Sequence, residues 1–223
     1  MPSLTRDDEV FVLDLGDTEN RFHPDWLVEL QVHLETVETA AGPRALVSTA
    51  TGKFFSNGLD LDWVGQHVDE FAGYVVSVHK LLARVLALPV PSVAAIQGHA
   101  FAGGAMLALA HDFRVMRADR GFFCLPEVDI NIPFSRGMAG LIQSRLSKRT
   151  AHEAMTTGRR YGGTDALDAG IVDAVAHEDD VLSTAIELAR PLAGKAGPTL
   201  GTIKARMYAD ALAALRDEAT PLE

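Results

Sequence analysis

The chain has 223 residues, of which 48% are hydrophobic and 22% are charged, proportions that are typical of a globular protein. A chain of this length buries about 70% of the surface that its unfolded form exposes, so a disordered tail, a collagen-like fibre and a disulfide scaffold are excluded. Twenty Lys and Arg against thirty Asp and Glu give a formal charge of −10, which disfavours binding to nucleic acid or to an anionic membrane.

The first half of the sequence alternates between strand and helix patterns. Residues 9–16 form a short apolar run that ends at a glycine and predict a strand. A proline near the first helical position and apolar residues at helical spacing predict an amphipathic helix over 24–40. A second strand is predicted at 44–51, followed by a loop rich in Gly, Asn and Asp over 52–64. The helical pattern then returns from 64 to 88.

The second half continues the alternation. Residues 92–98 are apolar without a polar face, which is typical of a strand buried on both sides. A loop of small residues leads into a short helix over 105–112 that is apolar on nearly every side. Further strands are predicted at 113–118 and 171–176, and a final helix over 195–215. Because strands and helices alternate throughout, the predicted class is α/β with largely parallel strands in one core domain, followed by a helical C-terminal region.

Signals for a location outside the cytoplasm are missing from the sequence. The single cysteine, Cys124, has no internal partner, which favours a reducing compartment. Acidic residues precede the short N-terminal apolar run, the reverse of a secretory signal. The most apolar region, 81–110, is interrupted by charged, polar and proline residues, so no membrane span is predicted. The last four residues match neither a peroxisomal nor a prenylation signal. We therefore expect a cytoplasmic protein.

Several common catalytic motifs are also missing. The sequence contains no phosphate-binding P-loop, no dinucleotide turn of the right glycine spacing, no zinc motif and no nucleophile elbow. The sequence therefore lacks the motifs that usually indicate phosphoryl transfer, hydride transfer, metal-dependent hydrolysis or elbow-type esterase chemistry. We predict neither a metal nor a cofactor.

Two glycine-containing segments could provide backbone hydrogen-bond donors. In the segment 56–60, Gly58 permits an unusual backbone angle and exposes the amide that follows it. The segment 102–104 lies at the start of an apolar helix, where free N–H groups suit an anionic oxygen. Two such donors directed at one oxygen form an oxyanion hole. Tight packing of a helix against a strand is the alternative explanation for either segment alone.

Glu127 lies in the apolar stretch 121–134, where a carboxylate is unusual. Burial raises the pKa of a carboxyl group, and a raised pKa suits a general base. A cap on a helix or turn, or a buried salt bridge to Arg114 or Arg136, would explain the same residue.

Five segments follow one another along the chain: NRFHPDWLVEL, GKFFSNGLDL, PSVAAIQGHAFAGGAMLALAHDFRVM, FFCLPEVDINIPF and RRYGGTDALDAGIVDAV. In this order they resemble the enoyl-CoA hydratase/isomerase (crotonase) superfamily. The resemblance implies a crotonase-like spiral of ββα units over 1–175, and a C-terminal helical region over 176–223 that serves oligomerisation and covers the active site. It also implies an acyl-CoA substrate, with CoA entering only as part of the thioester, and a homotrimer or a dimer of trimers.

The resemblance also assigns roles to individual residues. The backbone N–H groups of Leu59 and Gly103 correspond to the oxyanion hole, and Glu127 corresponds to the catalytic glutamate of the family. The loop with Ser56, Asn57, Gly58, Asp60 and Leu61 resembles the backbone that holds the CoA group. Gly104, Met106 and Phe134 are further candidates for contact with the substrate, although core packing explains Phe134 equally well.

Met106 departs from the pattern of the hydratases, which carry a second glutamate at this position. A thioether neither holds a water molecule in place nor moves a proton. The sequence therefore favours a Δ3,Δ2-enoyl-CoA isomerase of fatty acid metabolism, in which Glu127 alone moves a proton from C2 to C4. The alternatives are a hydratase or other crotonase-type enzyme that works with Glu127 alone, and a catalytically silent binding protein with the same fold.

Polar residues near these segments have simpler interpretations. On a strand, Asp129 would share the face of Glu127, but a surface or structural role is favoured. Asp60 is expected to cap or brace its own loop. Lys53 and Lys204 are candidates for contact with CoA phosphates, although a solvated side chain is favoured for each.

Overall fold

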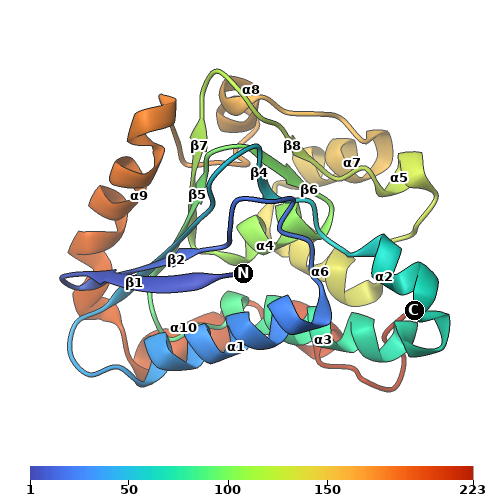
Figure 1. Cartoon of the computed structure of the whole chain (residues 1–223), viewed down its shortest axis with the longest axis horizontal. Helices are drawn as coiled ribbons and strands as arrows, with labels where there is room; N and C mark the ends of the chain where they lie inside the picture. Colours follow the sequence, from blue (N-terminus) through green and yellow to red (C-terminus); the bar gives the residue numbers. More distant parts are fainter. Residues whose placement is uncertain (223) are drawn as a thin grey trace.

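The strands form two sheets at the centre of the molecule (Figure 1). The computed structural model describes residues 1–222. In the larger sheet, β1 pairs antiparallel with β2, and the other neighbours in the order β1-β2-β3-β5-β7-β9 pair in parallel. Its strands are Ser3–Asp7, Val10–Asp14, Ala45–Thr49, Ser92–Ile96, Phe113–Arg117 and Ala174–Ala176. The smaller sheet is parallel, in the order β4-β6-β8, and its strands are Phe54–Ser56, His99–Phe101 and Phe123–Cys124.

Helices surround both sheets. The α-helices are α1 (Pro24–Thr39), α2 (Leu61–Gln66), α3 (Phe71–Leu86), α4 (Gly103–Ala110), α5 (Glu127–Ile130), α6 (Arg136–Arg145), α7 (Lys148–Thr157), α8 (Gly163–Asp168), α9 (Val181–Ala189), α10 (Pro198–Met207) and α11 (Ala209–Leu215). Short 3₁₀ segments occupy Val68–Glu70, Glu178–Asp180 and Arg190–Lys195.

Successive parts of the chain contribute one strand to each sheet and then a helix. The units are β3-β4-α2, β5-β6-α4 and β7-β8-α5. Because the strands of each unit pair in parallel with those of the next, the carboxyl ends of β4, β6 and β8 lie at one edge of the smaller sheet. The predicted α/β class and the predicted spiral of ββα units are confirmed.

The central strands of the larger sheet, β3 and β5, are buried on both faces, and the residues of β5 show why. Val93 and Ala95 pack in a cluster with α9, whereas Ala94 and Ile96 point into the main core with the remaining helices. In Figure 1, α9 is the orange helix beside the sheet. The expectation of a strand that is apolar on both sides is therefore confirmed.

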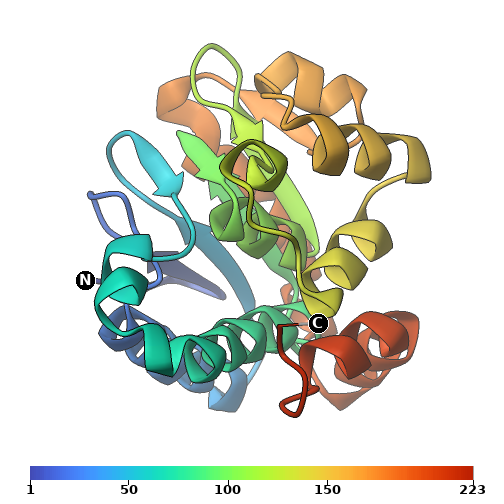
Figure 2. The same ribbon diagram turned by 90° about the vertical axis from the view of Figure 1, so that its right-hand side faces the viewer.

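The C-terminal helix α11 packs against α3 and α6, and Figure 2 shows it in red beside these helices. The prediction of one helix over 195–215 is wrong, because α10 ends at Met207 and α11 begins at Ala209. Tyr208, between them, leaves helical geometry with φ −110° and ψ 26°.

Two other expectations need correction. The helix predicted from 64 to 88 is divided into α2, a 3₁₀ turn and α3. The strands β4 and β6 lie inside segments that were expected to be loops, because runs of three residues are too short to show a period. Along residues 1–222, no helix has the length and apolar character needed to cross a membrane. The cytoplasmic location stays a prediction.

Candidate active site

The smaller sheet gathers the predicted site residues at one edge. Asn57, Gly58 and Leu59 follow β4 directly, and Gly103 comes two residues after β6. Glu127 comes three residues after β8, whose register pairs Phe101 with Cys124. Since β4 and β8 both pair in parallel with β6, their carboxyl ends meet at the same edge.

The two glycine segments touch through their backbones. Gly58 has φ +78°, and a Cβ atom placed on it would lie 2.5 Å from the backbone nitrogen of Gly103. A Cβ atom on Gly104 would lie 2.2 Å from the carbonyl oxygen of Ser56. Only glycine allows the two segments to approach this closely at these positions.

The two predicted oxyanion donors are free to bind another group. Within residues 1–222, neither the backbone N–H of Leu59 nor that of Gly103 donates a hydrogen bond. Gly103 is the first residue of α4, where the N–H has no partner inside the helix and carries partial positive charge. Both amides therefore suit an oxygen that gains negative charge.

A strained residue connects β6 to α4. Ala102 has φ 49° and ψ −123°, a backbone conformation that residues other than glycine rarely adopt. Its N–H donates to the carbonyl of Cys124 at 3.0 Å, and its carbonyl accepts the N–H of Met106 at 3.0 Å. Strain of this kind costs about 1–3 kcal/mol and occurs preferentially at functional sites.

Glu127 is the first residue of α5, and its side chain is buried, with 6% of the residue exposed. Its Oε2 atom has no hydrogen-bond partner within residues 1–222. Burial raises the pKa of this carboxyl group to about 7. Neither of the two arginines considered above pairs with it in the described chain: Arg114 instead binds Asp173, with 3.2 Å between Nη2 and Oδ2. A buried carboxyl group without a cation can hold or release a proton near neutral pH.

Asp129 does not share the face of Glu127. The segment is helical, so residues two apart point in different directions, and the shared face that a strand would give is not present. Asp129 is exposed, in agreement with the surface role favoured from the sequence.

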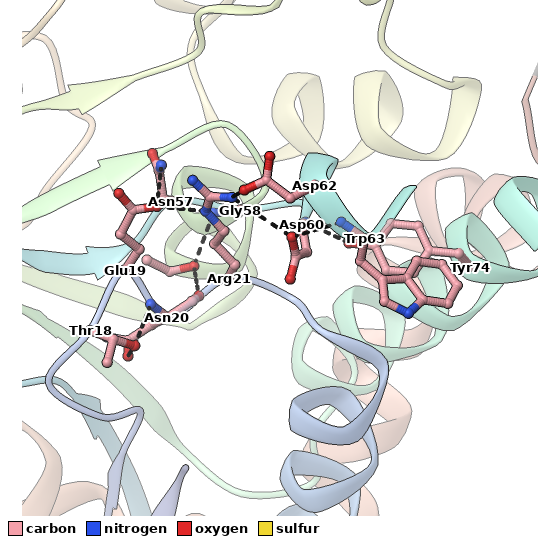
Figure 3. Close-up of polar contacts among 11 residues, drawn as sticks. Thr18, Glu19, Asn20, Arg21, Asn57, Gly58, Asp60, Asp62, Trp63 and Tyr74 are labelled. Atoms are coloured by element: carbon pink, nitrogen blue, oxygen red, sulfur yellow. Dashed lines mark hydrogen bonds and ion pairs between the residues drawn. The ribbon is translucent and has the colours of Figure 1, made fainter. Parts of the chain in front are cut away.

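The remaining residues of the first loop are held by the fold itself. Ser56 is fully buried, and its hydroxyl donates to the carbonyl of Asn20 at 2.7 Å. Asp60 caps α2 by accepting the N–H of Trp63 at 3.2 Å, so the expected bracing role is confirmed. Leu61, the first residue of α2, is 46% exposed. Figure 3 shows the contact between Asp60 and Trp63.

Met106 and Phe134 belong to the apolar surroundings of the site. Met106 is 1% exposed and lies in the main core within α4, whereas Phe134 is half-buried and packs against that core. Both positions are compatible with the wall of a pocket and equally with core packing.

Three residues that support the first loop were not singled out from the sequence (Figure 3). The Nδ2 of Asn20 donates to the carbonyls of Phe54 and Phe55, each at 3.1 Å. Arg21 forms ion pairs with several carboxylates, Asp60 among them at 3.7 Å. Tyr74 accepts a hydrogen bond from the loop through its hydroxyl. Asn20 and Arg21 begin one of the five segments that resemble the family, so the sequence could have indicated their importance. Tyr74 lies on an apolar helix face, and nothing in the sequence distinguishes it from a residue of the core.

The two candidate lysines differ. Lys53 is exposed, and its Nζ lies 5.2 Å from the centre of the Phe54 ring. Lys204 is 4% exposed, and its Nζ donates to Asp112 at 2.7 Å and to the carbonyl of Val90 at 3.1 Å. The expectation of a solvated Lys204 is wrong, because the ammonium group is held inside the fold.

The C-terminal end of α4 is held by the guanidinium group of Arg145. Arg145 donates to the carbonyls of Leu109, His111 and Asp112 at 2.8–2.9 Å, and also to the hydroxyl of Tyr208. Positive charge at the C-terminus of a helix complements its dipole. The helix that begins with Gly103 is thereby fixed at its opposite end. In the described part of the chain, no three His, Cys, Asp or Glu side chains are grouped as a metal site requires.

Comparisons with known proteins agree on one family. The family model described as enoyl-CoA hydratase/isomerase matches residues 6–220. Enoyl-CoA delta isomerase 3 of Arabidopsis thaliana is 35% identical over 219 residues, which cover 93% of this chain and 92% of the plant protein. A solved structure of an enoyl-CoA isomerase of Mycobacterium tuberculosis has a TM-score of 0.89 at 31% identity and covers 97% of this chain and 95% of that one. A putative enoyl-CoA hydratase of Thermus thermophilus is 33% identical over 208 residues, 90% of this chain and 81% of that protein.

Proposed function

The chain belongs to the enoyl-CoA hydratase/isomerase family, and on this basis we propose that it is a Δ3,Δ2-enoyl-CoA isomerase. Such an enzyme moves the double bond of an acyl-CoA from C3 to C2. The observation that carries the proposal is a buried Glu127 without a charged partner, at the sheet edge where two glycine segments present free N–H groups.

In the proposed reaction, the Glu127 carboxylate takes a proton from C2 of a 3-enoyl-CoA. The electron pair of the broken C–H bond moves toward the thioester carbonyl, and a dienolate forms. The N–H groups of Leu59 and Gly103 donate hydrogen bonds to the dienolate oxygen, a contribution of about 2.7–4 kcal/mol for one such donor in other enzymes. Glu127 then returns the proton to C4, which leaves the double bond between C2 and C3. A pKa of about 7 suits both proton transfers.

Met106 favours isomerisation over hydration. Hydration requires a water molecule that is held and deprotonated, and the hydratases of the family use a second glutamate at this position. Here a thioether packs in the main core and is 1% exposed. Isomerisation needs one base that serves two carbons, and Glu127 is such a base. Hydration by Glu127 alone is the second candidate, because a relative is named a putative hydratase.

The same family membership supports two further parts of the proposal. The proton moves between two carbons of one substrate, so the reaction requires no metal or redox cofactor. We also propose assembly into a homotrimer or a dimer of trimers through the C-terminal region, which light scattering of the purified protein tests.

The function is tested by assaying the purified protein with trans-3-hexenoyl-CoA, followed as formation of the conjugated 2-enoyl-CoA. We expect turnover by the wild type and a loss of at least about a thousandfold in Glu127→Gln, since the amide accepts no proton. Asp129→Asn, which changes an exposed carboxylate two residues away, is the matched control and should retain activity.

Other outcomes contradict the proposal in different ways. Full activity of Glu127→Gln would place the base elsewhere. Hydration of crotonyl-CoA at a rate equal to or above that of isomerisation would favour the hydratase. A wild type that turns over neither substrate would favour a catalytically silent member of the family.

A further inference from the structure

We infer that the hydroxyl groups of Tyr74 and Ser56 position the backbone N–H of Leu59, so that Tyr74 is a positioning residue for the reaction. The inference rests on the proposed function, because it concerns the orientation of one donor of the oxyanion hole. It adds a side chain, Tyr74, that comes from α3 and is separate from both glycine segments.

Three consecutive amides of the first loop show the pattern on which the inference depends. The N–H of Gly58 donates to Oγ of Ser56 at 3.1 Å, and the N–H of Asp60 donates to Oη of Tyr74 at 2.9 Å. Between them, the N–H of Leu59 has no acceptor within residues 1–222. One side-chain hydroxyl therefore binds each neighbour, and the middle amide is left available.

The hydroxyl of Tyr74 is well fixed. The residue is 4% exposed, and its ring packs against Trp63 with the ring centres 5.3 Å apart. The backbone N–H of Trp63 in turn donates to the carboxylate of Asp60 at 3.2 Å. Burial raises the pKa of Tyr74, so the group stays a neutral hydroxyl. The loop after Leu59 is thus bound to α3 through the backbone of Asp60 and to α2 through the carboxylate of Asp60 (Figure 3).

The hydroxyl of Ser56 is fixed from the other side. It donates to the carbonyl of Asn20 at 2.7 Å, which directs its lone pairs toward the N–H of Gly58. Asn20 is itself buried, has a left-handed φ of 48°, and binds the carbonyls of Phe54 and Phe55 through Nδ2. The loop before Leu59 is therefore attached to the segment that precedes α1.

Orientation matters because the strength of a hydrogen bond falls steeply when the donor is misaligned. An oxyanion donor acts by being directed, before the reaction, at the place where charge develops. Without the hydroxyl of Tyr74, the peptide groups on either side of Leu59 gain freedom to rotate. Binding of the neutral substrate would change little, whereas binding of the charged dienolate would weaken.

The test compares Tyr74→Phe with Tyr161→Phe. Both changes remove one hydroxyl from a buried tyrosine, but the hydroxyl of Tyr161 donates to Glu153 at 2.8 Å, outside the oxyanion loop. For Tyr74→Phe we expect a kcat for trans-3-hexenoyl-CoA that is about fivefold to tenfold lower, the equivalent of one neutral hydrogen bond, with KM within about twofold of the wild type. Affinity for the enolate of a 3-oxoacyl-CoA, followed by its ultraviolet absorbance, should fall by the same factor. Tyr161→Phe should change neither.

Each result decides the inference. An unchanged kcat and enolate affinity in Tyr74→Phe, or an equal loss in Tyr161→Phe, would overturn it while the isomerase stands. A wild type that binds the enolate but leaves 3-hexenoyl-CoA unchanged would overturn the proposed function, and the enolate affinity of Tyr74→Phe would still test the inference. If Tyr74→Phe does not fold, Ser56→Ala removes the other hydroxyl and should show the same split between kcat and KM.

Discussion

Replacing Glu127 with glutamine should stabilise the folded protein at alkaline pH and much less in acid. Burial raises the pKa of this carboxyl group from 4.5 to about 7, so the folded chain holds the proton more tightly than the unfolded chain does. Between pH 4.5 and 7 the unfolded chain loses this proton whereas the folded chain keeps it, so the free energy of unfolding decreases as the pH rises. Above pH 7 the folded chain loses the proton as well, and the decrease stops. The difference in pKa corresponds to about 3 kcal/mol at pH 8 and about 1 kcal/mol at pH 5. Glutamine carries no such penalty.

Urea unfolding of the wild type and of Glu127→Gln at pH 5 and pH 8 measures this difference. The expected signature is a gain from the substitution that is about 2 kcal/mol larger at pH 8 than at pH 5, since any packing effect of the amide is the same at both. Asp129→Asn, an exposed carboxylate two residues away, controls for the loss of one negative charge. Equal gains at both pH values would refute the reasoning. The same pKa requires kcat/KM to rise about tenfold per pH unit below 7 and then to level off.

Three further substitutions, two of them with a matched control variant, test the geometry. Gly58→Ala should abolish turnover and destabilise the fold by about 1–3 kcal/mol, because its Cβ would lie 2.5 Å from a backbone nitrogen of the second glycine segment. Gly65→Ala, where nothing lies within 4 Å, should be neutral or slightly stabilising in the same denaturation assay. Ala102→Gly should leave the free energy of unfolding unchanged or raise it by about 1 kcal/mol, since φ is 49°; a loss of that size would argue against strain. Lys204→Ala should cost about 3–5 kcal/mol by leaving a carboxylate unpaired, against less than about 1 kcal/mol for Lys80→Ala at an exposed ion pair. Similar losses in thermal or urea unfolding would contradict the assignment of a buried pair.

The class of the fold followed from periodicity, but the arrangement of the site did not. The helix predicted over 24–40 and the strand predicted at 92–98 show a clear period or an unbroken apolar run, and both are present as α1 and β5. The smaller sheet consists of strands of two or three residues, which are too short to be recognised. Its register is nonetheless what brings the carboxyl ends of β4, β6 and β8 together.

Within the site, residues whose type contrasts with the surrounding sequence were easier to predict than residues whose role depends only on where the fold places them. Gly58 and Glu127 stood out because glycine and a carboxylate contrast with their surroundings. Tyr74 did not, since a tyrosine on an apolar helix face is usually explained by packing alone. Lys204 was misjudged because a helical pattern does not show which lysine turns inward to meet a partly buried carboxylate from a distant part of the chain.

The hydrogen bonds of Arg145 at the C-terminal end of α4 have a consequence for the synthesis of the protein. Gly103 and Glu127 leave the ribosome well before Tyr208, whose hydroxyl accepts a hydrogen bond from Arg145, the residue that holds the last carbonyls of α4. Lys204, which joins α10 to the core, also emerges late. A nascent chain therefore contains Gly103, Glu127 and Arg145 before it has the hydroxyl of Tyr208 and the ammonium group of Lys204. Full support of the C-terminal end of α4 would therefore come only after the residues of the proposed site have been synthesised.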